Sequence, residues 1–469
     1  MTEASSWGPR RVATWVAAVA ASAALAVGAA YAVPPLLRAT GAWSDGGSPT
    51  IAATVFTPPP DPVAAEGEGA VGAAPGIAAA HRLDPARLQT AIGALNQDGI
   101  GASAFLVTDP GGEPLAHGNA VSALIPASTM KLLTGLAVIG SLDPHHRFAT
   151  RVLSPGEGTI VLVGGGDPYL ATASATSGYP RPASLADLAK TTAAALKSSG
   201  KASVTLGYDA SLFVGPDWEP TWEKVFETDV TRVSALTADG GIDPATKTRT
   251  ATPAASAAAA FAALLRSEGI DVAAGIAPAS GSGAELARVD SLPVHTLVQE
   301  ALLRSDNTAT EVLLRHAALS AGQEGSFTGA TATLRDHLQR LGVWAEGAHI
   351  QDGSGVSRDN RVTATMLARA VSLVLIEERF RVLLDSFPVA GATGTLHNRF
   401  EADGTQPGRG FVRAKTGSLR DVSALAGYAR TADGQSVIVV FLSNQVTNLA
   451  AARAWMDRAS AIVAGCGCR

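Results

Sequence analysis

Ser128 and Lys131 have the residue types and the spacing to perform a reaction together. The sequence predicts a helix over 127–139, and residues three positions apart share one helix face, so the amine can reach the hydroxyl. A serine hydroxyl becomes a good nucleophile when a nearby base removes its proton. Lysine can be that base when burial or a second cation lowers its pKa. This spacing is common by chance, so the pair needs support from other motifs.

Two further triplets carry suitable chemistry. Taken alone, Ser-Asp-Asn at 305–307 predicts a helix cap or a turn, and Lys-Thr-Gly at 415–417 predicts the end of a strand. Together with Ser128 and Lys131 they follow the order S-x-x-K, S-D-N, K-T-G, which is found in serine β-lactamases and penicillin-binding proteins. The combination predicts an acyl transfer in which Ser128 is the nucleophile.

From about residue 80 to its C-terminus, the chain resembles the low-molecular-mass class C penicillin-binding proteins, the D-Ala-D-Ala carboxypeptidase/endopeptidase family (peptidase S13-like). The long separation between Lys131 and Ser305 is characteristic of this class, whose members carry large inserted domains there. The resemblance also covers PASTMKLLT at 126–134, LVGGGDP at 162–168, DGSGVSR at 352–358, NRVT at 360–363, AGATGTL at 390–396, AKTGSL at 414–419 and VSALAGY at 422–428.

The resemblance implies a set of catalytic roles. Ser128 would attack the carbonyl between two D-alanines, D-Ala would leave, and water would hydrolyse the acyl-enzyme. Lys131, as a neutral amine, would be the base for acylation. Ser305 would relay the proton to the leaving amine. No cofactor and no metal are expected.

It also implies how substrate is held. Asn307 would hydrogen-bond the substrate peptide and orient the catalytic lysine. Lys415 would keep that lysine deprotonated and, with Thr416, bind the terminal carboxylate. Gly417 would let the substrate backbone approach the strand closely. The backbone N–H groups of Ser128 and Ser418 would form the oxyanion hole.

Three more side chains have two interpretations each. Arg358 follows a Gly-Ser-Gly turn, so it could bind the carboxylate of a diaminopimelate-type stem peptide, or it could be a solvated surface arginine. Trp218 and Trp222 could line a substrate groove or pack in the core.

The elements that position these residues follow from periodicity. Strands are predicted at 101–108, 159–163, 203–206, 410–416, 423–431 and 436–443, and helices at 85–95, 185–197, 257–267, 364–376 and 449–463, with a long helical pattern from 292 that includes residues 305–307. Strands at both chain ends, with helices between, predict one sheet assembled from distant segments. The expected fold class is α/β (α+β): an antiparallel transpeptidase-type sheet flanked by helices, with a large inserted region of one or two smaller domains.

The resulting domain boundaries are 81–150 and 285–469 for the catalytic domain, and 151–284 for the insertion. Residues 39–80 are rich in Pro, Ala and Gly and predict a flexible linker. Before them, Arg10 and Arg11 precede an uncharged apolar run over 12–33, long enough to span a hydrocarbon core of about 30 Å. Residues 1–38 are therefore expected to be a signal peptide or a membrane anchor, which predicts an extracytoplasmic protein, secreted or anchored, on the cell-wall side of the bacterial membrane.

Composition excludes several other classes. The net charge is −5 for 469 residues and no basic stripe is present, so no nucleic-acid partner is expected. Cys466 and Cys468 are the only cysteines, which excludes a disulfide-dependent fold. No H-E-x-x-H motif or G-x-S-x-G elbow occurs, which argues against zinc peptidases and α/β-hydrolases.

The expected partners are therefore peptidoglycan stem peptides and, as covalent inhibitors, β-lactam antibiotics. Two alternatives remain open at this point. One is a β-lactamase, for which no glutamate motif for deacylation is evident. The other is a non-catalytic peptidoglycan-binding scaffold, against which the five intact motif residues count. The preference between carboxypeptidase and endopeptidase action stays open as well.

Overall fold

The computed structural model describes residues 83–156 and 158–465, which fall within one compact unit, Ile77–Arg469. The apolar run at 12–33, the linker at 39–80 and the cysteines at 466 and 468 lie outside the described residues. Among the helices of the described part, none is long and apolar enough to cross a membrane.

A five-stranded antiparallel sheet forms the centre of the catalytic body, with the order β2-β1-β11-β10-β9. Its first two strands come from the start of the described chain and its last three from the end; the sequence predicted a sheet assembled from both ends, but not the strand β2. The strands are β1 (Ala102–Thr108), β2 (Pro114–Gly118), β9 (Val412–Leu419), β10 (Val422–Arg430) and β11 (Ser436–Asn444).

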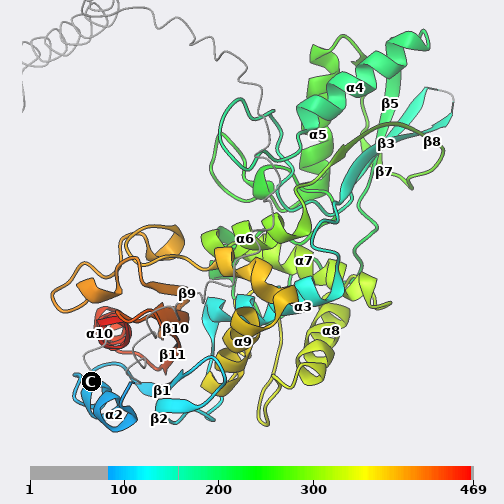
Figure 1. Cartoon of the computed structure of the whole chain (residues 1–469). Helices are drawn as coiled ribbons and strands as arrows, with labels where there is room; N and C mark the ends of the chain where they lie inside the picture. The colour runs from blue at the N-terminus through cyan, green and yellow to red at the C-terminus, as the bar shows by residue number, and fades with distance from the viewer. Residues whose placement is uncertain (1–82, 157, 466–469) are drawn as a thin grey trace, which may run out of the picture. The chain divides into compact units, whose positions relative to one another are not determined.

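Helices cover both faces of this sheet, so its central strands are apolar on both sides (Figure 1). On one face, Leu106, Ala426 and Val440 pack against α9 and belong to one apolar cluster with α3, α6, α7 and α8. On the other, Phe105 and Phe441 pack with α2 and α10. These helices are α2 (Pro85–Gly93), α3 (Met130–Ser141), α6 (Val294–Arg304), α7 (Asn307–Ser320), α8 (Phe327–Arg340), α9 (Ala364–Ile376) and α10 (Leu449–Gly465).

A second, mixed sheet belongs to the segment inserted between α3 and α6. Its order is β6-β5-β4-β3-β8, with β7 beside β5, and its core packs against α4 and α5. The elements are β3 (Ala149–Gly156), β4 (Thr159–Val163), β5 (Ser203–Asp209), β6 (Asp271–Val272), β7 (Ala277–Pro278), β8 (Ala284–Asp290), α4 (Leu185–Ser198) and α5 (Pro253–Ser267).

Short 3₁₀ turns complete the described chain. They are η1 (Ala127–Thr129), η2 (Lys224–Thr228), η3 (Asp239–Gly241), η4 (Glu378–Ser386), η5 (Gly394–Leu396) and η6 (Gln406–Gly408). The first of them matters for the site, because the helix expected from residue 127 begins there as a 3₁₀ turn and becomes α-helical at Met130.

The fold class predicted from the sequence is confirmed: helices flank an antiparallel sheet, and a second sheet is inserted. Two local predictions differ from the structure. The long helical pattern from residue 292 is broken at Ser305, because that residue adopts a left-handed conformation with φ 57° and ends α6. The boundary at 284/285 cuts β8, which pairs with β3 through Asp290 and so belongs with the inserted sheet. The division into domains itself stays a prediction.

Candidate active site

Ser128 lies in the 3₁₀ turn that leads into α3, and its side chain is half-buried. The preceding residue, Ala127, has a φ of +46°, a conformation that costs a non-glycine residue of the order of 1 kcal/mol or more. The hydroxyl of Thr129 donates to the carbonyl of Pro126 at 2.7 Å, which closes the turn. The turn therefore holds the Ser128 hydroxyl at the beginning of the helix.

Lys131 lies one helical turn further along, fully buried. Its Nζ atom lies 3.0 Å from Ser128 Oγ, 2.7 Å from Asn307 Oδ1 and 2.6 Å from the backbone carbonyl oxygen of Ser354. A carboxamide oxygen and a backbone carbonyl can only accept hydrogen bonds, whereas a hydroxyl can also donate. A neutral amine would donate its two protons to Asn307 and Ser354 and accept the proton of Ser128. The three partners thus fit an uncharged lysine that serves as a base.

Burial lowers the pKa of Lys131 to about 8, against three carboxylates that raise it, those of Asp352, Glu311 and Asp306. Desolvation is the larger effect because the ammonium form loses its hydration in the interior. A substantial fraction of Lys131 is therefore neutral in mildly alkaline solution.

The Ser-Asp-Asn triplet connects α6 to α7. Ser305 ends α6 in its left-handed conformation, and the Asp306 side chain accepts from the backbone N–H of Ala309 at 2.9 Å, which caps α7. This sharp change of direction places Asn307 in the first position of α7, where its Oδ1 reaches Lys131. The interpretation as a helix cap is correct for Asp306, while Ser305 contacts Lys415 and Asn307 contacts Lys131.

Lys415 lies on β9 and is also fully buried. Its Nζ atom lies 3.0 Å from Ser305 Oγ and 2.9 Å from the carbonyl oxygen of Thr416. Burial, and then the positive charge of Lys131, hold the pKa of Lys415 well below its ordinary value. Two buried amines so arranged oppose double protonation, which favours one neutral amine in the site.

The strand β9 is the outer strand of the central sheet and packs against the nucleophile turn. A Cβ atom at Gly417 would stand 2.7 Å from the carbonyl oxygen of Pro126, so only glycine fits this contact. Next to it, the Thr416 hydroxyl donates to Thr395 Oγ1 at 2.7 Å, and exposed Ser418 has its Oγ 3.3 Å from Arg453 Nη2. The motif strand and the nucleophile are therefore in direct contact.

Arg358 lies apart from this network and pairs with Asp421, with Nη2 2.6 Å from Oδ1. Its side chain is 28% exposed, so it is neither fully solvated nor buried. Of the two tryptophans, Trp222 is 4% exposed in an apolar cluster that includes Phe327, and partly buried Trp218 packs against that cluster. The core-packing interpretation fits them.

The sequence interpretation missed three residues around Lys131: Ser354, Glu311 and Asp352. Glu311 Oε1 accepts from the backbone N–H groups of Gly353 and Ser354 at 3.0 and 2.7 Å. Its burial, followed by the charge of Asp352, raises the pKa of Glu311 to about 8. The DGSG run at 352–355 was a usable signal, because an acidic residue before Gly-Ser-Gly predicts a turn closed by that side chain.

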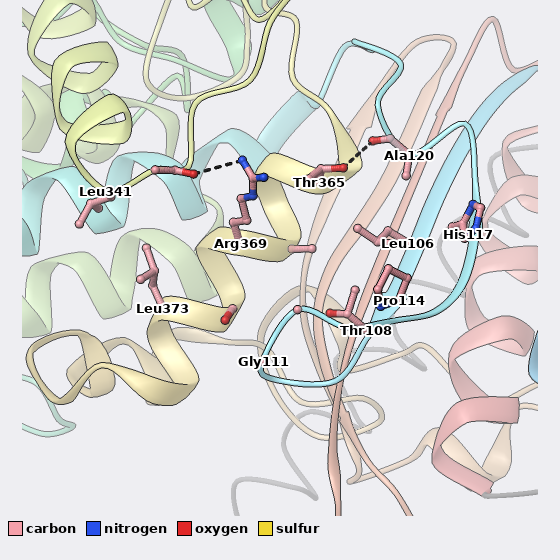
Figure 2. Close-up of a pocket in the computed structure, with 14 residues that line it drawn as sticks. Leu106, Thr108, Gly111, Pro114, His117, Ala120, Leu341, Thr365, Arg369 and Leu373 are labelled. Atoms are coloured by element: carbon pink, nitrogen blue, oxygen red, sulfur yellow. Dashed lines mark hydrogen bonds between the residues drawn. The ribbon is translucent and has the colours of Figure 1, made fainter. Parts of the chain in front are cut away.

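A separate cavity of about 580 Å³ lies between β1, β2 and α9 (Figure 2). Leu106, Leu373 and His117 line it together with Arg369, which donates to the carbonyl of Gly342 at 3.2 Å. None of the lysines, serines or asparagine of the three motifs is among its lining residues. This cavity is therefore distinct from the catalytic cluster.

The amino-acid sequence is similar to those of known proteins over most of the chain. The sequence profile of the D-Ala-D-Ala carboxypeptidase 3 (S13) family matches residues 88–249 and 245–464. A carboxypeptidase of Mycobacterium tuberculosis is 35% identical over 336 residues, which is 69% of this chain and 71% of that protein. Carboxypeptidase DacB of Mycolicibacterium smegmatis is 32% identical over 357 residues, which is 73% of this chain and 76% of that carboxypeptidase.

The fold also matches a solved structure. Penicillin binding protein 4 from Haemophilus influenzae superposes with a TM-score of 0.65 over 80% of this chain and 98% of that one, at 22% identity. The family profile spans most of the described residues, and a relative at 35% identity covers more than two thirds of the chain. The chain therefore belongs to the D-Ala-D-Ala carboxypeptidase 3 (S13) family, the class C low-molecular-mass penicillin-binding proteins, and is a serine-type carboxypeptidase/endopeptidase.

Proposed function

We propose that this carboxypeptidase hydrolyses the D-Ala-D-Ala bond of peptidoglycan stem peptides through an acyl-enzyme on Ser128. The observation that carries the proposal is the 3.0 Å separation between Lys131 Nζ and Ser128 Oγ, with two pure acceptors occupying the amine's own protons. That geometry leaves the nitrogen lone pair facing the hydroxyl proton.

In the first half-reaction, Ser128 Oγ attacks the carbonyl carbon of the penultimate D-Ala while its proton moves to Lys131. The C–N bond then breaks, and the amine of the departing D-Ala takes a proton through Ser305, whose hydroxyl lies 3.0 Å from Lys415 Nζ. In the second half-reaction, water attacks the ester while Lys131, which has given up its first proton to the leaving amine, takes a proton from that water; the C–Oγ bond breaks, and this proton passes to Ser128. The same sequence at a D-Ala cross-link is the endopeptidase reaction.

Substrate is held along β9 in this proposal. Lys415 and Thr416 bind the terminal carboxylate, and Asn307 bonds the substrate amide. The backbone N–H groups of residues 128 and 418 stabilise the oxyanion, a contribution that typically accounts for about 10²–10³ in rate per donor. The close contact between Gly417 and Pro126 supports the oxyanion assignment, since it brings the two segments that supply these donors together.

Arg358 is the proposed partner of the carboxylate on the third residue of the stem peptide. To bind the substrate carboxylate, Arg358 would have to release Asp421, or use the guanidinium nitrogen that Asp421 does not contact. The Arg358→Ala variant is expected to raise KM for a stem peptide with such a carboxylate without slowing acylation by a small β-lactam. Equal effects on both substrates would remove Arg358 from the binding site.

β-Lactams are the proposed covalent inhibitors, since they present a strained amide to the same serine. The Haemophilus influenzae relative in fold is named a penicillin binding protein and has been solved in complex with a β-lactam. We also propose export, with residues 1–38 acting as signal peptide or membrane anchor, on the basis of Arg10, Arg11 and the uncharged run at 12–33. Cell fractionation with and without residues 1–38 tests this, and a cytoplasmic full chain would refute it.

The decisive experiment is intact-mass analysis of the full chain after incubation with benzylpenicillin, beside Ser128→Ala. We expect a single stable adduct that the variant lacks, and D-Ala release from a pentapeptide by the wild type alone. Rapid turnover of a chromogenic cephalosporin would instead indicate a β-lactamase. Folded protein that neither forms an adduct nor consumes the antibiotic would indicate a wall-binding scaffold.

A further inference from the structure

One stretch of the inserted segment, residues 217–233, returns to the catalytic helices, and we call it the strap. Its ends are tied together, because the backbone N–H of Val233 donates to the carbonyl of Asp217 at 2.8 Å and Arg232 pairs with the Asp217 side chain at 2.8 Å. Within it, Trp222, Val230 and Val233 are buried in an apolar cluster with Val312 of α7 and Phe327 of α8. The strap is therefore packed onto the catalytic body.

The strap holds one side of the Lys131 site through Trp222. The buried indole Nε1–H donates to Asp352 Oδ2 at 2.7 Å. The same carboxylate accepts from the backbone N–H groups of Gly355 and Ser357 at 2.7 and 2.6 Å, so it closes the turn that follows it. This turn is the one that presents the Ser354 carbonyl to Lys131.

The other side of the Lys131 site is held through Asp229. Its backbone carbonyl accepts from Asn307 Nδ2 at 3.1 Å, and the backbone N–H of Thr231 donates to Thr308 Oγ1 at 2.9 Å. A carboxamide has one accepting and one donating end. Because the donating end is fixed on the strap, the accepting Oδ1 of Asn307 is directed at Lys131.

Apart from Ser128, the two groups that contact the Lys131 amine are thus both linked to the strap: Asn307 directly, and the Ser354 carbonyl through Asp352, beside the contact that Glu311 makes with the Ser354 N–H. We propose that the strap positions the catalytic lysine and that Trp222 is a positioning residue for it, acting through Asp352 and the Ser354 carbonyl. The inference rests on the proposed role of Lys131 as base. The proposal assigns the inserted segment a positioning role in the reaction at Ser128.

The hydrogen bond between Trp222 and Asp352 also has an electrostatic consequence. Four charged or titratable groups face Lys131: Asp352 from the turn, Glu311 from α7, Asp306 from the N-cap of that helix, and Lys415 from β9. The Trp222 N–H disperses the negative charge of the Asp352 carboxylate. Without that donor the carboxylate attracts the ammonium form of Lys131 more strongly, so the base is available only at higher pH.

The test is Trp222→Phe in the full chain, which keeps an aromatic ring and removes the N–H donor. We expect acylation by benzylpenicillin to slow about tenfold, the loss for one hydrogen bond to a charged group, and the midpoint of its rise with pH to move upward. For a pentapeptide, kcat should fall while KM changes little. The matched control is Trp455→Phe, another buried tryptophan, whose N–H finds no acceptor among the described residues. It should lose stability but keep the wild-type rate and midpoint.

A wild-type midpoint and rate in Trp222→Phe would overturn the proposal, as would the same midpoint shift in Trp455→Phe. If Trp222→Phe does not fold, benzothienylalanine at position 222 replaces the N–H by sulfur within a ring of the same size, and the same slowing and shift are required of it. Failure of the proposed function is seen separately: the wild type itself would then form no adduct that Ser128→Ala lacks, and the inference would fall with it.

Discussion

The backbone carbonyl of Ser354 lies 2.6 Å from the Nζ of Lys131, although 223 positions separate the two residues in the chain. Glu311 on α7 holds the Ser354 N–H, and Asp352 closes the same turn. The base is therefore oriented by groups outside the three motifs as well as by Asn307, and its reactivity depends on a buried turn whose backbone N–H groups are bound by two carboxyl side chains.

Acylation should depend on pH through Lys131. The base must be neutral, and burial lowers its pKa to about 8, so the rate should rise about tenfold per pH unit below 8 and level off above it. The rate constant for fluorescent penicillin between pH 6 and 10 measures this. Lys131→Arg, which stays protonated over this range, should be about 10³-fold slower with no such rise. A flat wild-type profile would contradict the assignment of the base.

Asn307→Asp should move that profile to higher pH. The new carboxylate would lie near the 2.7 Å contact with Lys131 Nζ and favour the ammonium, raising the midpoint by about 1 unit or more. Asn307→Ala removes the acceptor without adding charge, so it should slow acylation with no upward shift. Identical midpoints in the two variants would show that this contact does not set the protonation of the lysine.

Gly355→Ala should damage both stability and acylation. Gly355 has a φ of +82°, and a Cβ there would stand 1.9 Å from the carbonyl oxygen of Ala127, directly before the nucleophile. We expect a loss of at least about 3 kcal/mol in unfolding free energy, with slower acylation of the folded fraction. Gly342→Ala is the control, since its φ is +66° with nothing within 4 Å, and it should cost only about 1 kcal/mol. Chemical denaturation measures both, and equal losses would contradict the clash.

Glu311→Gln should make stability less sensitive to pH. The pKa of Glu311 is raised to about 8 in the folded state from an ordinary 4.5, so between these values the folded chain binds more protons and wild-type stability falls as pH rises. Glutamine keeps the acceptor for Gly353 and Ser354 without the charge. The stability of this variant relative to wild type should increase from pH 5 to pH 8 by about 3–4 kcal/mol, because each pH unit between the two pKa values corresponds to about 1.4 kcal/mol.

The companion variant Glu311→Ala leaves those two buried N–H groups without an acceptor, which should make it about 3 kcal/mol less stable than Glu311→Gln at every pH. Urea unfolding at pH 5, 6.5 and 8 distinguishes the two substitutions. A glutamine variant that loses as much stability as the alanine variant would show that the carboxyl group is needed for more than its acceptor oxygen.

Much of the fold could be predicted from local pattern. The helix at 364–376 and the strand at 159–163 were predicted with the bounds that the structure has, because strong apolar periodicity and clear end signals lie within the segments themselves. The Ser-Asp-Asn triplet taken alone predicted a helix cap or a turn, but the helical pattern from residue 292 was extended through it, since a left-handed serine between two helices has no strong local signal. The end of the inserted sheet at Asp290 was also missed, because β8 is defined by its partner β3 and not by its own sequence.

By itself, the sequence determined the chemistry available to this protein: a serine with a lysine one helical turn away, a second serine and asparagine, and a second lysine, in the order of a known family. Only the tertiary structure decided that Lys131 faces Ser354 and Asn307, that Trp222 and Asp229 of the inserted segment hold these acceptors, and that Arg358 pairs with Asp421. The physical reason is that these contacts join segments far apart in the sequence. They form, and bury Lys131 so that its pKa falls, only when the helices, the β9 strand and the strap pack around its side chain.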